Sequence, residues 1–96
     1  MDKVHDVQSI RPGNTFLYLT VDGQSYRVRW VDCSSRLARA TLSQRKHLEV
    51  SPSGYGIHWP EIDEDLAITP LLQQAEVLDR QEATREQRML VMAEAV

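Results

Sequence analysis

The sequence contains one cysteine, Cys33, and no long apolar run. A single cysteine cannot form an internal disulfide, so a disulfide-stapled scaffold is excluded and nothing requires an oxidising compartment. Every apolar run falls well short of the roughly 20 residues that cross a bilayer. Residues 1–4 also lack the basic and then apolar pattern of a leader. We therefore expect a cytoplasmic protein that does not enter a membrane.

Extremes of composition are absent as well. Apolar residues make up 42% and charged residues 26% of the 96 positions, which is ordinary for a globular protein and unlike a disordered or fibrous chain. A chain of this length can enclose one modest core but not two. We therefore expect a single folded domain.

The net charge of −3 conceals an uneven distribution. Residues 27–47 are rich in arginine, with Asp32 as their only acid, whereas residues 49–65 contain acids and neither lysine nor arginine. Such an asymmetry is typical of a nucleic-acid face, of two mutually attractive surfaces, or of two solvated faces without a partner. Two solvated faces are the default interpretation.

Asp22-Gly23 lies between two strand-like segments, residues 15–21 and 24–31, and predicts a tight β-hairpin. A two-residue turn fixes the register of the hairpin, because side chains alternate between its two faces. One face then carries the following pairs, which we expect to face the core: Leu19 with Tyr26, Leu17 with Val28, and Thr15 with Trp30.

The opposite face of the hairpin pairs Tyr18 with Arg27 and Phe16 with Arg29. Aromatic rings beside guanidinium groups can form a cation–π surface, a platform for nucleic-acid bases, or the seat of a further helix. An aromatic residue beside an arginine on a sheet is, however, more often part of ordinary packing than a nucleic-acid site. A nucleic-acid site, as the alternative, would combine these residues with the arginines that follow: Phe16, Tyr18, Arg27, Arg29, Arg36 and Arg39.

Short elements are predicted on both sides of the hairpin. Residues 4–10 alternate weakly and predict a first strand, and residues 11–14 predict a turn. After the hairpin the apolar period lengthens, which indicates short helices with Leu37 and Leu42 as their core contacts. Candidate N-caps for these helices are Asp32, Ser34 or Ser35 for the first, and Thr41 or Ser43 for the second.

The chain then reaches a dense run of special residues, which predicts a further strand. Tyr55, Ile57 and Trp59 would share its core face, while Pro60 would end it because proline lacks the N–H of a strand ladder. The run reads Gly54-Tyr55-Gly56-Ile57-His58-Trp59-Pro60-Glu61, one further residue, and Asp63-Glu64-Asp65-Leu66.

This run resembles the signature of a family of small bacterial domains of unknown function. Members typically have a β-hairpin, a short helical segment rich in arginine and leucine, the signature and a closing Leu-Leu pair, and all four parts occur here between Thr15 and Leu72. The resemblance implies a small α+β fold and a gene layout like that of toxin–antitoxin pairs, since members are often encoded beside a second small protein. It implies no catalytic residue, and it does not extend over residues 76–96.

Metal binding or catalysis by the signature is less favoured than a structural role. His58 and the acids after it could supply metal ligands, but their spacing lacks the paired histidines of a zinc helix and the glycine-containing loop of an EF-hand. No serine, cysteine or lysine nucleophile is placed beside His58. Cys33 precedes a predicted helix, where the pKa of a thiol can fall, yet a half-buried structural role is the commoner one. We predict no catalytic residue, no metal and no cofactor.

Thr69-Pro70 predicts the start of a helix, with threonine as N-cap and proline in the first turn. No glycine or proline interrupts residues 71–96, so one long helix or a helix with a frayed end is expected. We divide the chain into a domain, residues 1–78, and a helical extension, residues 79–96. The apolar end of the extension, Met89 to Met92, would contact a second copy or another protein.

Together these features predict a small α+β domain with an antiparallel sheet of four to five strands, short helices and a C-terminal helix. The leading hypothesis for function is a non-enzymatic protein-interaction module, the antitoxin-like or accessory member of a bacterial two-gene module. Its alternatives are a nucleic-acid-binding regulator that uses residues 27–46, and a phage- or plasmid-encoded inhibitor of a bacterial defence complex. The predicted partner-binding residues are His58, Glu61, Asp63, Glu64, Asp65, Met89, Leu90 and Met92.

Overall fold

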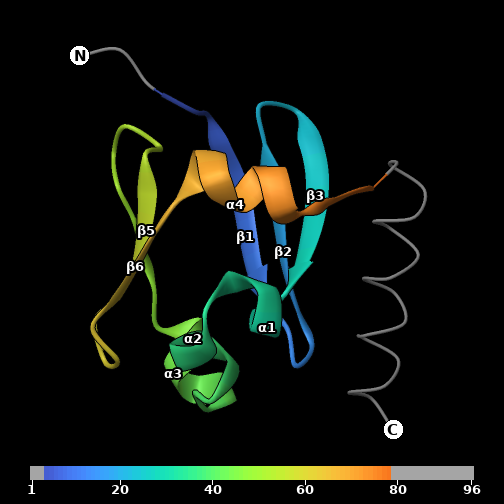
Figure 1. The fold of residues 1–96 in the computed structure, drawn as a ribbon. Helices are drawn as coiled ribbons and strands as arrows, with labels where there is room; N and C mark the ends of the chain where they lie inside the picture. Colours follow the sequence, from blue (N-terminus) through green and yellow to red (C-terminus); the bar gives the residue numbers. More distant parts are fainter. Residues whose placement is uncertain (1–3, 79–96) are drawn as a thin grey trace, which may run out of the picture.

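The computed structural model describes residues 4–78, which form two antiparallel sheets and four short helices (Figure 1). The larger sheet has the order β1-β2-β3-β7, from β1 (Val7–Pro12), β2 (Phe16–Val21), β3 (Gln24–Arg29) and β7 (Glu76–Leu78). The smaller sheet has the order β4-β5-β6, from β4 (Glu49–Val50), β5 (Gly56–Trp59) and β6 (Glu64–Ala67). The helices are α1 (Trp30–Cys33), α2 (Ser35–Ala38), α3 (Leu42–Lys46) and α4 (Ile68–Gln74). The predicted α+β class is confirmed, and the signature strand belongs to the smaller sheet.

The β2–β3 hairpin has the predicted turn and register. Asp22 and Gly23 have φ of 53° and 82°, so both central residues are left-handed, as a type I′ turn requires. The strands pair with Val21 opposite Gln24 and Leu17 opposite Val28, in the predicted alignment. The aliphatic side chains of β2 therefore face inward, where Leu17, Leu19 and Val21 are buried.

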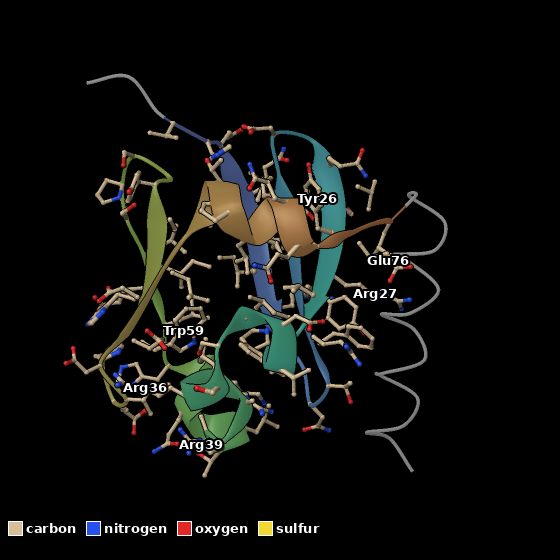
Figure 2. The ribbon with its side chains drawn as sticks, viewed as in Figure 1. Tyr26, Arg27, Arg36, Arg39, Trp59 and Glu76 are labelled. Carbon is tan, nitrogen blue, oxygen red and sulfur yellow. The ribbon has the colours of Figure 1, made fainter. Side chains whose placement is uncertain are left out.

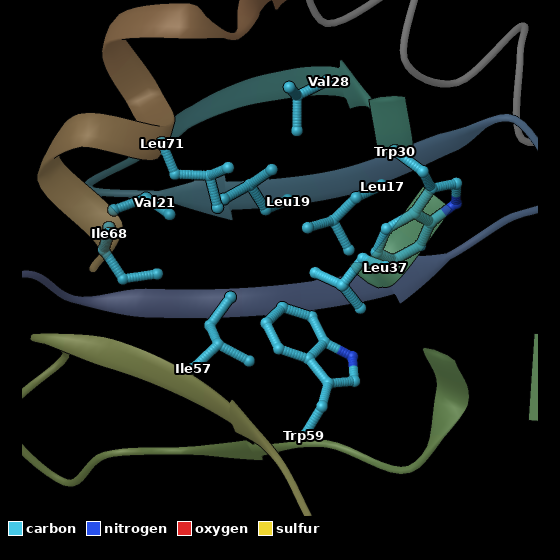
Figure 3. Close-up of a cluster of buried hydrophobic side chains, with 10 residues drawn as sticks. All are labelled: Leu17, Leu19, Val21, Val28, Trp30, Leu37, Ile57, Trp59, Ile68 and Leu71. Carbon is cyan, nitrogen blue, oxygen red and sulfur yellow. The ribbon is translucent and has the colours of Figure 1, made fainter. Parts of the chain in front are cut away.

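The core lies between the two sheets, where two tryptophans meet (Figure 3). Trp30 and Trp59 are both buried, and their rings contact edge to face with centroids 6.3 Å apart. The Trp59 indole N–H donates to the Arg45 carbonyl at 2.9 Å, and that of Trp30 donates to the Gly13 carbonyl at 2.8 Å. Each indole is thus buried with its polar group satisfied.

Two hydroxyl caps place the short helices. The Ser34 hydroxyl accepts a hydrogen bond from the Leu37 amide at 2.9 Å, and Thr41 forms a capping box with Gln44. Both caps are among the predicted candidates. Leu37 is fully buried as a result of this placement, as predicted, whereas Leu42 is only half-buried and does not belong to the core.

The N-terminal segment, Val4 to Asp6, joins elements that are distant in the sequence. His5 Nδ1 and Asp22 Oδ2 are 2.7 Å apart, and His5 Nε2 lies 2.7 Å from Thr69 Oγ1 in α4. The His5 amide also donates to the Ser53 carbonyl, which precedes β5. A hydrogen bond from the Asp6 amide, and then the His5 ring, hold the pKa of Asp22 below its usual range. The segment therefore links the hairpin tip, the smaller sheet and α4.

The predicted long C-terminal helix is wrong within the described residues. Helix α4 ends at Gln74, and Ala75 is extended, with ψ of 151°. The chain continues as β7, which pairs with β3 and so provides partners for backbone groups at the sheet edge. Thr69 is not the N-cap, because the helix begins after Ala67 and the Thr69 hydroxyl contacts His5 instead. Residues 79–96, with the predicted contacts Met89, Leu90 and Met92, lie outside the described residues.

Two further predictions need correction. The first strand spans Val7–Pro12, not residues 4–10, because Val4 and His5 donate their amides to Ser53 instead of to a strand. Tyr55 is 62% exposed and does not share the core with Ile57 and Trp59. Strand β5 begins only at Gly56, so the alternation that should turn Tyr55 inward does not extend to it.

Candidate functional site

A row of polar side chains crosses the outer face of the smaller sheet. Strand β5 pairs with β6 so that His58 faces Asp65, and His58 Nδ1 lies 2.7 Å from Asp65 Oδ1. On the other side, β4 places Glu49 directly opposite His58. Paired residues in a sheet point to the same face, so two carboxylates flank one imidazole there.

A groove of about 660 Å³ adjoins this row. Gly56 and Ala67 form the neighbouring outward pair, and their small size leaves the sheet surface uncovered. The exposed Tyr55 ring adds an apolar wall. Figure 1 shows the smaller sheet at the left of the molecule with no described helix over its outer side. The groove therefore combines an apolar floor with an acidic end.

The other acids of the signature do not gather around His58. Glu61 lies in the turn after β5, where its carboxylate is 2.8 Å from His47 Nδ1. Asp63 has a φ of 50° and stands in the turn before β6, whereas Glu64 and Asp65 belong to the strand itself. The three consecutive acids Asp63, Glu64 and Asp65 therefore do not share one loop. Of the predicted set, the structure brings together only His58 and Asp65.

The basic segment is largely engaged with the backbone. The Arg36 guanidinium donates to the Asp63 carbonyl at 2.8 Å and to the Ile62 carbonyl at 3.3 Å, so it holds the signature turn without pairing with a carboxylate. Arg39 donates to the Ser35 carbonyl. Arg45 donates to three carbonyls, those of Asn14, Leu37 and Ala38. These arginines thus stabilise turns and helix ends.

The predicted aromatic and basic face lies on the outer side of the larger sheet. The Arg27 guanidinium lies 4.6 Å from the centre of the Phe16 ring, and the Phe16 and Tyr18 rings are 5.9 Å apart. Arg27 is also 2.6 Å from the Glu76 carboxylate, while Arg29 pairs with Asp32 at 3.0 Å.

Arg36 and Arg39 lie far from this face. Figure 2 shows them near α2, well apart from Arg27 and Glu76 beside β3 and β7. The six residues of the nucleic-acid alternative therefore do not form one surface.

Cys33 is not an activated thiol. Burial, and secondly the nearby Asp32 charge, raise the pKa of Cys33 to about 12. The half-buried structural role is thus the appropriate one.

We expect Cys33 in the folded protein to react with iodoacetamide at pH 8 at least ten times more slowly than in the unfolded chain, because the thiolate is the nucleophile. Mass spectrometry with and without urea would measure both rates. Equal rates would contradict the burial of this thiol.

Residues 4–78 contain neither a cluster of metal ligands nor a helix that could span a membrane. Among these residues no three histidine, cysteine or acidic side chains converge so that they could hold a metal ion. None of the described helices has both the length and the apolar character needed to cross a membrane.

The fold and the site define a small two-sheet α+β domain with an open, acidic groove on its smaller sheet. The chain belongs to the family described as "Protein of unknown function (DUF2442)", whose model matches residues 7–77. No curated protein and no solved structure matches the chain. The family match thus covers both sheets and the groove, and it ends one residue before the end of β7.

Three residues that line the groove were not predicted from the sequence: Glu49, Gly56 and Ala67. Glu49 lies nine positions before His58, and only the pairing of β4 with β5 brings them together. The sequence does contain a signal for Gly56. Because side chains alternate along a strand, Gly56 and His58 must face outward if Ile57 and Trp59 face inward. The partner strands could not be chosen from the sequence.

Proposed function

We propose that this protein is a non-enzymatic interaction module that binds a protein partner through the outer face of the β4–β5–β6 sheet. It serves as the antitoxin-like or accessory member of a bacterial two-gene module. The observation that carries the proposal is the open groove of about 660 Å³ with Glu49, His58 and Asp65 at one end.

The shape and charge of the groove support protein binding. An apolar floor beside exposed carboxylates suits a partner that presents both apolar and basic side chains. The Glu49 carboxylate forms no ion pair with any residue in the range 4–78, and the Asp65 side chain is 74% exposed. Both charges are accessible to a partner.

The gene layout implied by the resemblance supports the proposed role in a two-gene module. The product of the neighbouring gene is therefore the first partner to test.

The nucleic-acid alternative has less support, because Arg27 and Arg29 already pair with Glu76 and Asp32. These ion pairs would have to break before either guanidinium is fully available to a phosphate group.

The full chain and the neighbouring gene product should form a complex that can be measured by titration calorimetry. The double change Glu49→Gln with Asp65→Asn should raise the Kd at least tenfold, since charge-assisted hydrogen bonds contribute about 1.5–3 kcal/mol each. The matched control is Glu76→Gln on the other sheet, which should leave the Kd within about twofold.

Three results would contradict the proposal. Failure of the neighbouring product to bind at all would remove the two-gene assignment. Binding with an unchanged Kd by the double variant would remove the groove as the contact. A chain that ends at Leu78 should still bind, and loss of binding by that chain would transfer the contact to residues 79–96.

A further inference from the structure

The outer face of the smaller sheet presents two different subsites at a fixed spacing. The first is the pair Gly56 and Ala67, which lacks large side chains. The second is the row of Glu49, His58 and Asp65, one outward position further along β5. Outward positions on one strand are two residues apart, which corresponds to about 6.8 Å.

From this spacing we propose that the groove recognises an extended segment of the partner in which a lysine or arginine and a large apolar residue are separated by one residue. The inference rests on the proposed function and names the chemistry of the partner. The apolar side chain lies over Gly56 and Ala67, and the cation lies above His58, within reach of the carboxylates of Glu49 and Asp65.

Charge favours a cation over an anion at the polar subsite. Glu49 and Asp65 contribute two negative charges, and His58 between them contacts Asp65 at 2.7 Å. Among the residues that the structure describes, no lysine or arginine lines the groove. An acidic side chain of a partner would meet like charges there, whereas a basic one gains charge-assisted hydrogen bonds.

Geometry favours an extended segment over a helix. Side chains of an extended chain project to one side at every second residue, which matches the period of β5 beneath it. Positions two apart on a helix point in different directions and cannot occupy both subsites. The Tyr55 ring, which is 62% exposed, borders the apolar subsite and can cover the partner's apolar side chain.

The test uses the full chain and a synthetic heptapeptide with lysine at its third and leucine at its fifth position, and serine or threonine elsewhere. Backbone amide chemical shifts of the ¹⁵N-labelled protein would be followed during titration. We expect saturable changes confined to residues 49–67. Peptides with glutamate in place of the lysine, with serine in place of the leucine, or with the two residues adjacent should each bind at least fivefold more weakly.

Two variants separate the subsites. Ala67→Gln fills the apolar subsite and leaves both carboxylates in place, whereas Glu49→Gln with Asp65→Asn removes the charge and leaves the floor open. Each should weaken binding of the peptide at least fivefold, and Glu76→Gln should not. Amide spectra of the free variants confirm that each is folded.

Three outcomes overturn the inference: equal binding of the glutamate peptide, equal binding of the peptide with adjacent residues, or no shift at millimolar peptide. If the neighbouring gene product still binds in a manner that depends on Glu49 and Asp65, these outcomes reject the segment pattern alone. If that protein also fails to bind, the proposed function fails with it.

Discussion

Replacement of Gly54 by alanine is expected to destabilise the domain by about 3 kcal/mol or more, through backbone strain together with steric overlap. Gly54 has a φ of +72°, where an L side chain costs about 1–2 kcal/mol. In addition, a Cβ at this position would lie 2.0 Å from the carbonyl oxygen of His5 and 2.8 Å from its carbonyl carbon. Both are backbone atoms and cannot rotate away, so the N-terminal segment would have to move.

Gly23 provides the matched control for Gly54. It has a similar φ of +82°, but a Cβ there would meet nothing within 4 Å. Gly23→Ala should therefore lower the free energy of unfolding only by the cost of the left-handed backbone conformation, about 1–2 kcal/mol. Urea unfolding followed by far-ultraviolet circular dichroism would give both free energies. Equal losses in the two variants would contradict a close contact between Gly54 and His5.

A second test of the same contact removes its other side. A chain that lacks residues 1–6 no longer contains the His5 carbonyl, so Gly54→Ala should destabilise that shortened chain by no more than Gly23→Ala does. Persistence of the full loss in the shortened chain would place the strain elsewhere.

Trp59→Ala is expected to reduce the free energy of unfolding by about 3–5 kcal/mol, the usual range for truncation of a buried tryptophan. Trp59 is fully buried, contacts Trp30 and donates to the Arg45 carbonyl. A domain of about 75 residues has about 4–11 kcal/mol of stability in total. The variant should therefore be partly unfolded at 37 °C.

Trp59→Phe separates packing from hydrogen bonding. It keeps an aromatic ring in the core but loses the donor to Arg45, so the half-buried carbonyl is left without this partner and a loss of about 1–3 kcal/mol is expected. Thermal unfolding by circular dichroism would rank wild type, Trp59→Phe and Trp59→Ala. A loss for Trp59→Ala below about 1 kcal/mol would show that this side chain is not central to the core.

Features that depend on neighbouring residues are predictable from the sequence. The Asp22-Gly23 turn fixes the hairpin register, and Ser34 and Thr41 cap helices within three residues of themselves. Each depends on a short-range backbone need that one residue type meets. The core residues Ile57 and Trp59 follow from alternation in the same way.

Features that depend on partners distant in the sequence are not predictable in this way. Residues 76–78 read as helix because good helix formers surround them, yet pairing with β3 overrides that local preference. The grouping of Glu49 with His58 and of Glu61 with His47 depends on which strands pair and where turns end. Spacing of acids along the sequence does not contain this information.

The contacts of His5 have a consequence for the folding mechanism. Its ring contacts Thr69, 64 positions later, while the β2–β3 hairpin closes over a two-residue turn. Ordering so large a loop costs more entropy than closing a hairpin, and long-range contacts of this kind slow folding. We expect the hairpin to nucleate folding and the His5–Thr69 contact to form after the rate-limiting step. Substitutions at His5 should then accelerate unfolding and leave the refolding rate almost unchanged.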